Sequence, residues 1–379
     1  MNYNHIYTDK FIERLFVHLG SHEVKGALDI FLFFFAFIKL FLLMINILSE
    51  ELILKIIKDL NSASDVAKCR LVCKGWNRLA EPVMLGKEVI IRSEEGALSL
   101  YAHLYSKPAF GKLIKQLTFE EDYLPVALLK GLLHFAFTPN MEYMTGSVST
   151  DQLYILMNTI ADKSPTKFLN LKTIPHPDSF SNVYNNSLIT FKDTLQDLVF
   201  HVEDVEEDDI WDMANQLETF KCLTKLTLSG PLLTVFNLED ILNGCSHLEE
   251  LTVNIKLQIN ILGKIEVDAW SATNVKILDS VKKVFIRREC RCDLLEYLLF
   301  KYPKIETIEI DVLLTPLVTA RNNLQRILNV IKKIHSSKVK LLFKEQDLAD
   351  SLKYIMADGT RFTISDVSGS EFSVIINRP

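Results

Sequence analysis

The sequence is poor in glycine and proline and carries only a small net charge. Of its 379 residues, 13 are Gly and 11 are Pro, whereas 48% are hydrophobic. This composition can bury a large core and leaves little room for long disordered tracts. The formal net charge of -6 excludes a strong basic field, so we expect no nucleic-acid partner.

Signatures of catalysis, nucleotide binding and metal binding are also missing. Gly-Lys pairs at 86–87, 111–112 and 263–264 lack the upstream glycine of a phosphate-binding loop. There is no His-Glu-x-x-His helix and no Gly-x-Ser-x-Gly elbow. Cys290 and Cys292 have no second pair at zinc spacing, and the six scattered cysteines fit structural thiols in a reducing compartment. We therefore predict a non-catalytic protein with no cofactor and no metal.

One long hydrophobic run, residues 27–48, stands near the N-terminus and is interrupted only by Asp29, Lys39 and Asn46. About 20 apolar residues span a bilayer, so a transmembrane helix is one interpretation. Against it, a charge such as Lys39 near the centre costs about 2.5–3.5 kcal/mol. A buried or partner-facing helix and a reading frame that starts too early are the alternatives. Residues 1–46 are therefore treated as a separate N-terminal segment for which these three interpretations remain.

Residues 47–86 have the pattern of a short helical module. Ser49 followed by Glu50 and Glu51 predicts a helix start. Apolar residues at 52, 53, 56, 57 and 60 repeat with helical spacing, and a polar break at 61–64 follows. Ser64-Asp65 is expected to open a second helix that carries Cys73 and Trp76, and Pro82 is expected to end the unit.

The order of these residues resembles the F-box family. Leu-Ser-Glu-Glu-Leu-Ile at 48–53, the Ile56-Ile57 pair, Leu60 and Val-Cys-Lys-Gly-Trp at 72–76 follow that family's pattern, with Ser49 in place of its proline. The resemblance implies that the module binds a Skp-family adaptor and, through it, a cullin. The residues implied in adaptor binding are Leu48, Ser49, Glu51, Leu52, Ile56, Leu60, Val72, Cys73 and Trp76. Trp76 itself is expected to pack mainly inside the module.

A second pattern, apolar-x-x-apolar-x-apolar, recurs through the rest of the chain. Its central residues Leu198, Leu226, Leu251, Val284 and Ile308 are separated by 28, 25, 33 and 24 residues. Leucine-rich repeats of about 20–29 residues carry such a motif at each strand, and helical stretches lie between these motifs. We therefore expect an α/β fold in which residues 87–379 form an irregular leucine-rich-repeat solenoid, capped by C-terminal strands. An ordinary α/β domain is the alternative.

In such strands the residues between the apolar positions face outward. Thr227, Thr252 and Phe285 would form one row on the open face of the sheet. The acidic run 203–209 follows a predicted strand, and its Glu206, Glu207, Asp208 and Asp209 could meet a basic segment. A solvated loop is the plainer interpretation of that run. The row and the four carboxylates are the candidate client-binding residues.

Together these features predict a substrate-recognition subunit of an SCF-type (Skp-cullin-F-box) ubiquitin ligase. The subunit would bridge a Skp-family adaptor and a client protein of unknown identity in the cytoplasm or nucleus. The alternative is a membrane-anchored leucine-rich-repeat scaffold, not engaged in ubiquitination, that is held by residues 27–48 with the F-box facing the cytosol.

Overall fold

A computed structural model describes residues 48–120, 124–202, 213–313, 321–334, 336–357, 361–368 and 371–377. The chain divides into two units, Met1–Met84 and Leu85–Pro379. The apolar run lies outside the described residues except for Leu48, so its membrane-spanning character stays a prediction. Among the described residues no helix is long and apolar enough to cross a membrane.

The described part of the first unit contains three short helices, α3 (Glu50–Asp59), α4 (Ala63–Cys69) and α5 (Lys74–Leu85). As predicted, Ser49 caps α3: its side chain accepts a hydrogen bond from the backbone N–H of Leu52 at 3.4 Å. Glu50 and Glu51 lie in the first turn, where the positive end of the helix dipole stabilises their carboxylates. The sequence pattern therefore located this helix start correctly.

Three predictions for the helices of this unit are wrong. Helix α4 begins after Ser62 and not at Ser64, because the Ser62 hydroxyl accepts from the backbone N–H of Asp65 at 3.1 Å. The second predicted helix is interrupted at residues 70–73, so Trp76 lies on a third helix. Pro82 does not end the unit but lies inside α5.

The core of this unit is small. Its hydrophobic cluster has five buried residues, Ile53, Ile57, Val66, Trp76 and Ala80, and the partly buried Leu48, Leu60, Cys69, Leu79, Val83 and Met84 pack against them. Trp76 is 9% exposed, which agrees with its predicted place inside the module. A core of this size is close to the minimum for independent folding.

The second unit is built on parallel strands that follow one another in chain order. A three-stranded sheet has the order β1-β2-β3, and an eight-stranded sheet has the order β10-β11-β9-β8-β7-β6-β5-β4. The strands from β4 to β9 pair in parallel, whereas β11 pairs antiparallel with β9 and β10. The strands are β1 (Val89–Ile91), β2 (Gln116–Phe119), β3 (Tyr143–Gly146), β4 (Asp197–His201), β5 (Lys225–Leu232), β6 (Glu250–Leu257), β7 (Lys283–Ile286), β8 (Thr307–Leu313), β9 (Ser336–Lys344), β10 (Arg361–Ser368) and β11 (Glu371–Asn377).

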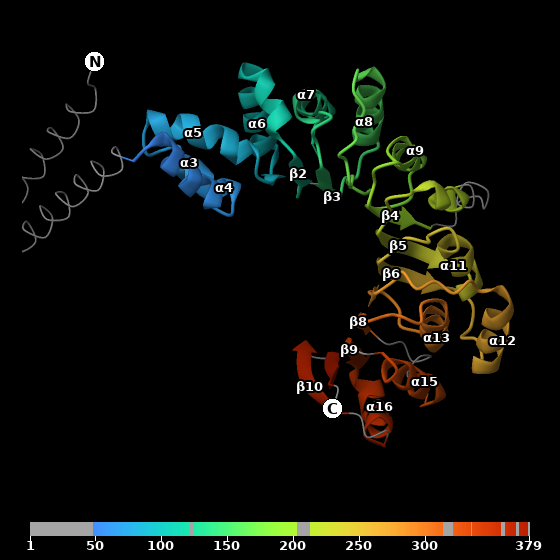
Figure 1. Cartoon of the computed structure of the whole chain (residues 1–379). Coiled ribbons are helices and arrows are strands. Elements are labelled where there is room, and N and C mark those ends of the chain that lie inside the picture. The colour runs from blue at the N-terminus through green and yellow to red at the C-terminus, as the bar shows by residue number, and fades with distance from the viewer. Residues whose placement is uncertain are drawn as a thin grey trace, which may run out of the picture. The chain divides into compact units, whose positions relative to one another are not determined.

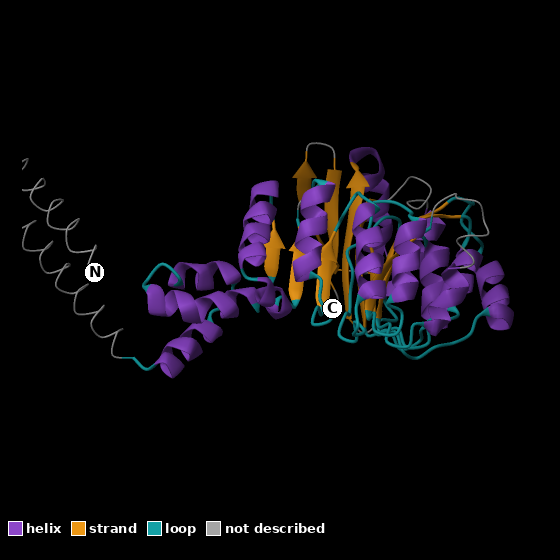
Figure 2. Ribbon diagram, turned by 90° about the horizontal axis from the view of Figure 1, so that it is seen from above, coloured by secondary structure: helices purple, strands orange, loops and turns teal. Residues whose placement is uncertain are grey.

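Helices alternate with these strands and cover one face of the sheets (Figures 1 and 2). They are α6 (Glu94–Ser106), η1 (Pro108–Leu113), α7 (Val126–Ala136), α8 (Gln152–Lys163), α9 (Asn182–Thr190), η2 (Leu217–Thr219), α11 (Val235–Leu242), α12 (Lys264–Asn274), α13 (Cys292–Lys301), α15 (Arg321–Ile331) and α16 (Glu345–Ala357). No described helix of this unit covers the other face of the eight-stranded sheet (Figure 2). We call this uncovered side the open face.

The recurring apolar motif is buried wherever it was found. In β4 to β8 its second and third positions point into the core, at 0–2% exposure. They are Leu198, Phe200, Leu226, Leu228, Leu251, Val253, Val284, Ile286, Ile308 and Ile310. The first position, which precedes each strand, is also buried. The period of two that distinguishes inward from outward residues in a strand is therefore present in all five motifs.

One backbone carbonyl before each strand fixes where the next strand begins. The carbonyl of Lys115 accepts from the N–H groups of Glu142 and Tyr143, at 2.8 and 2.9 Å. The same bond recurs from one strand to the next, at 2.8–2.9 Å for the first donor, along the series Lys115, Glu142, Lys172, Gln196, Thr224, Glu249, Lys282 and Glu306. We call this series the backbone relay. It continues from β3 through residues 172–176 to β4, so that the two sheets share one register.

Two glycines allow neighbouring chain segments to approach closely at the carboxyl ends of strands. Gly146 and Gly230 have φ angles of 108° and 118°, which L-residues with a side chain rarely adopt. A Cβ atom at Gly230 would lie 1.7 Å from the carbonyl oxygen of Val202, and one at Gly146 would lie 2.0 Å from that of Phe119. These positions therefore require glycine.

Candidate functional site

The helical unit exposes two apolar side chains on one side of α3. Leu52 and Ile56 are one helical turn apart, and they are 51% and 46% exposed. Ile53 and Ile57, their neighbours in sequence, are buried instead. Residues four apart on a helix share one face, so Leu52 and Ile56 form a continuous apolar strip. The core formed by the described residues of the unit does not include this strip.

A second pair of exposed apolar residues lies in the turn between α4 and α5. Leu71 is 86% exposed and Val72 is 41% exposed. Arg70 fixes this turn on α5, because its Nε donates to Asn77 Oδ1 at 2.8 Å and its guanidinium lies 3.5 Å from Glu81. Leu71 and Val72 are thus presented on an anchored turn. We refer to Leu52, Ile56, Leu71 and Val72 as the exposed apolar set.

The structure sorts the other predicted adaptor-binding residues into two groups. Ser49, Glu51 and Cys73 are exposed, whereas Leu48, Leu60 and Trp76 pack on or in the core. The basic residues around Trp76 also have internal roles, since Arg78 forms an ion pair with Glu50. The sequence prediction omitted Leu71, because a continuous helix would have placed it within an ordinary amphipathic stripe. Only the break at residues 70–73 exposes it.

The predicted row on the sheet is aligned in space. Thr227 lies opposite Thr252 in the β5–β6 register, and Thr252 lies opposite Phe285 in the β6–β7 register. All three are partly exposed, while the residues on either side of each are buried or point away. The row therefore lies on the open face. Its carboxylate counterpart, Glu206, Glu207, Asp208 and Asp209, lies outside the described residues.

Phe285 lies next to charged side chains. The guanidinium of Arg287 lies over its ring, 5.3 Å from the centroid. Arg287 also donates to Glu309 at 2.9 Å, and Glu309 lies opposite Phe285 in the β7–β8 register. The aromatic end of the row therefore carries a charge pair, which two-residue alternation within one strand could not reveal.

Charged side chains at the amino ends of the strands neutralise one another. Glu250 lies 3.4 Å from Lys225 and 3.3 Å from Lys283, on the strands on either side of it. In the same way, Glu142 lies 2.8 Å from Lys115 and 3.9 Å from Lys172. Opposite charges on neighbouring strands stabilise their pairing by a few tenths of a kcal/mol to about 1 kcal/mol. This border of the sheet is therefore structurally paired and is a poor candidate for a single-sign ligand.

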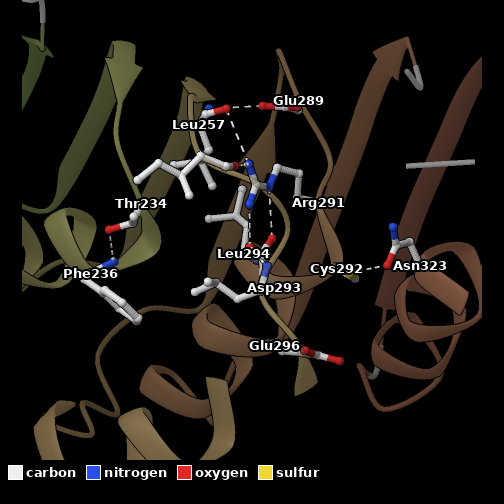
Figure 3. A network of polar contacts seen from close by, with 12 residues as sticks. Thr234, Phe236, Leu257, Glu289, Arg291, Cys292, Asp293, Leu294, Glu296 and Asn323 are labelled. Carbon is white, nitrogen blue, oxygen red and sulfur yellow. Dashed lines mark hydrogen bonds and ion pairs between the residues drawn. The ribbon is translucent and has the colours of Figure 1, made fainter. Parts of the chain in front are cut away.

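One buried ion pair of the second unit lies between β6 and α13 (Figure 3). Arg291 and Asp293 are 3% and 0% exposed, and their side chains form an ion pair at 2.6 Å. The guanidinium also donates to the carbonyl of Ile259 at 2.6 Å, and Asp293 accepts from the backbone N–H of Leu262 at 3.0 Å. The network closes on backbone groups of residues 259–262. It fixes that loop on α13 and offers no reactive group.

A second buried cluster joins α11 to α13. Lys301 Nζ donates to both carboxylate oxygens of Glu239, at 2.7 and 2.9 Å, and the Tyr297 hydroxyl donates to the same carboxylate at 2.7 Å. Burial lowers the pKa of Lys301, and the Glu239 carboxylate opposes this shift. Both charged groups are nearly inaccessible to solvent, which makes this cluster part of the core rather than a site.

Three of the six cysteines have the character of structural thiols. Cys245, Cys290 and Cys292 are buried and free. Burial raises the pKa of Cys245 to about 12 and that of Cys292 to about 11, so neither is a reactive thiolate near neutral pH. Within the described part of the chain no group of three His, Cys, Asp or Glu side chains could hold a metal ion.

Comparison with known protein families assigns the helical unit. Residues 50–85 match the F-box-like family. This span covers α3, α4 and α5 and includes the whole exposed apolar set. No curated protein sequence matches the chain.

Proposed function

We propose that this chain is a substrate receptor of an SCF-type ubiquitin ligase in the cytoplasm or nucleus. Its F-box-like unit would bind a Skp-family adaptor, and residues 85–379 would hold a client protein. The chain would perform no bond chemistry itself. It would act by proximity, because fixing two reactants near each other makes their reaction effectively unimolecular.

The observation that carries this proposal is the exposed apolar set on an F-box-like unit. A unit whose core comprises five buried residues gains stability when a partner covers its remaining apolar surface. Leu52 and Ile56 on α3, with Leu71 and Val72 on the anchored turn, provide that surface. The half-buried Leu48 and Leu60 would support it from the core side.

The client-binding part of the proposal rests on residues 85–379 as a leucine-rich-repeat-type solenoid. Parallel strands in chain order, helices on one face and the backbone relay support this assignment. The open face would receive the client at Thr227 and Thr252, with the Phe285–Arg287 pair beside them. The four carboxylates at 206–209 would assist by attracting a basic segment.

The adaptor-binding proposal is tested by replacing Leu52 and Ile56 together with Asp in the full chain. Both side chains are about half exposed, so the helices should remain folded while two charges disrupt an apolar interface. We expect co-purification with a Skp-family adaptor to fall at least tenfold, which corresponds to about 1.4 kcal/mol of binding free energy. Leu48 is left unchanged, because it packs against the core.

The matched control places the same substitutions on a helix of the other unit. Leu98 and Tyr105 on α6 are 55% and 67% exposed, and their replacement with Asp should leave adaptor recovery unchanged. Circular dichroism must show equal helix content in both variants. Equal adaptor recovery from the Leu52/Ile56 variant and the control would overturn the proposal.

A further inference from the structure

The eight-stranded sheet ends in a strand that has one unpaired edge. β10 is the last strand in the order of the sheet and pairs with β11 alone, and it is drawn in red in Figure 1. No described strand pairs with its other edge. A free edge presents a row of backbone N–H and C=O groups on which another strand can pair.

β10 lacks most of the devices that protect edge strands. It is eight residues long and contains neither proline nor lysine, and its only irregularity lies between Asp366 and Ser368, near its end. Natural edge strands are usually short, bulged, or interrupted by proline or lysine. Residues 361–366 therefore form a regular edge that remains competent for pairing.

An exposed isoleucine stands near the middle of this edge. Ile364 is 46% exposed, although it lies opposite the fully buried Val374 of β11. Its neighbours Thr363 and Ser365 are exposed as well. One side of Ile364 thus packs beside a core residue, while its other side, toward the free edge, lacks a neighbouring strand. A strand added at this edge would cover it.

The sequence of β10 suits a copy of itself. RFTISDVS contains one arginine and one aspartate, so two copies would meet without net charge. When two identical antiparallel strands are related by a two-fold axis, the residue on the axis lies opposite its own copy. With Ile364 on the axis, the two isoleucines would lie about 4.5–5.5 Å apart at Cβ and would cover each other.

We propose that the protein forms a symmetric dimer in which β10 of one copy pairs antiparallel with β10 of a second copy, centred on Ile364. The two eight-stranded sheets would then form one continuous sheet across the axis. A single strand pair is a small interface, so the dimer would be weak, with a dissociation constant on the order of micromolar. The dimer does not depend on the proposed adaptor or client.

The test uses charge at the two-fold axis, measured by analytical ultracentrifugation of the full chain over about 1–100 µM. Ile364→Arg places two positive charges opposite each other at the two-fold axis. Ile364→Glu places two negative charges there. We expect each variant alone to be monomeric across this range. An equimolar mixture of the two variants should form dimers again, because Arg then lies opposite Glu.

The control is Ile265→Arg on α12, where an isoleucine that is 86% exposed is changed without touching β10. This variant should dimerise like the unchanged chain. A chain that is monomeric over the whole range overturns the proposal, and so does a dimer that survives both single substitutions. An equimolar mixture of the Ile364→Arg and Ile364→Glu variants that stays monomeric also overturns the proposal. Restored dimerisation is expected only if β10 of one copy pairs with β10 of the other.

Discussion

The exposed apolar set of the helical unit and the strand motifs of the second unit place apolar side chains in opposite environments. In the helical unit four apolar residues are more than 40% exposed, and Leu71 reaches 86%. In the strands of the second unit the corresponding apolar positions are almost completely buried, as Leu226 and Leu251 show at 1% and 0%. Neighbouring strands pair side by side, so the apolar positions of one strand pack beside those of the next. The core formed by the described residues of the helical unit does not include Leu52, Ile56, Leu71 or Val72.

The contrast has an energetic consequence. A substitution on the exposed apolar set should affect binding and leave stability nearly unchanged, because these side chains are already in contact with water. A substitution inside the stacked unit should affect stability, because its packing is continuous from one repeat to the next. The following predictions test this division, from the largest expected effect to the smallest.

Lys301→Met should produce the largest loss of stability. It leaves the carboxylate of Glu239 buried without its cation, and an unpaired buried charge typically costs about 3–5 kcal/mol. The double variant Lys301→Met/Glu239→Gln should recover much of this loss, because no charge is then buried. Urea unfolding followed by circular dichroism measures both free energies.

The control for this prediction is Lys264→Met on α12. Lys264 forms an exposed pair with Asp268 at 2.7 Å, and both side chains are more than half exposed. Exposed pairs of this spacing contribute only about 0.3–0.5 kcal/mol. If Lys301→Met proves as harmless as Lys264→Met, then the Glu239 cluster is not sealed as the structure indicates.

Within the helical unit, Ile57→Ala should destabilise and Leu71→Ala should not. Ile57 is 0% exposed, and truncation of a buried isoleucine to alanine costs about 2–5 kcal/mol. Leu71→Ala should change the unfolding free energy by less than about 0.5 kcal/mol and still weaken adaptor binding. Urea unfolding followed by circular dichroism measures the free energy of unfolding of each variant. Equal destabilisation by both variants would contradict the separation of core and exposed apolar set.

The smallest effect is expected from Glu250→Gln at the border of the sheet. The substitution removes two ion pairs, with Lys225 and Lys283, whose side chains are about half exposed. We expect a loss below about 1 kcal/mol that shrinks further at high salt, because salt screens exposed charges. Thermal unfolding at low and high sodium chloride measures it. A large loss that is independent of salt would mean that Glu250 has another role.

The strands and the start of the first helix could be predicted from the sequence, because both depend on local patterns. Each apolar motif specifies its own inward and outward residues, and Ser49 caps the helix that follows it. The break at residues 70–73 was not predictable in this way. It depends on Arg70 reaching Asn77 and Glu81, which are themselves placed by the fold.

The surroundings of individual charged residues could not be predicted from the sequence either. Lys301 is the last residue of the amphipathic helix α13. A lysine at this position usually faces solvent and is stabilised by the negative end of the helix dipole. Its burial depends on Glu239, which lies 62 residues earlier in the chain. In the same way, Arg287 lies over the ring of Phe285 and forms an ion pair with Glu309 of the neighbouring strand β8. Contacts between distant residues decided what local patterns could not.

The backbone relay makes the second unit local in its folding. Each carbonyl of the series fixes the strand that follows it, between 24 and 33 residues later in the chain. Order can therefore spread from any one repeat to the next without closing a long loop. The register is set again at each strand, so that a segment inserted between two strands displaces only its own loop. Segments that connect two strands can therefore change in length and charge, while the strands on both sides stay aligned.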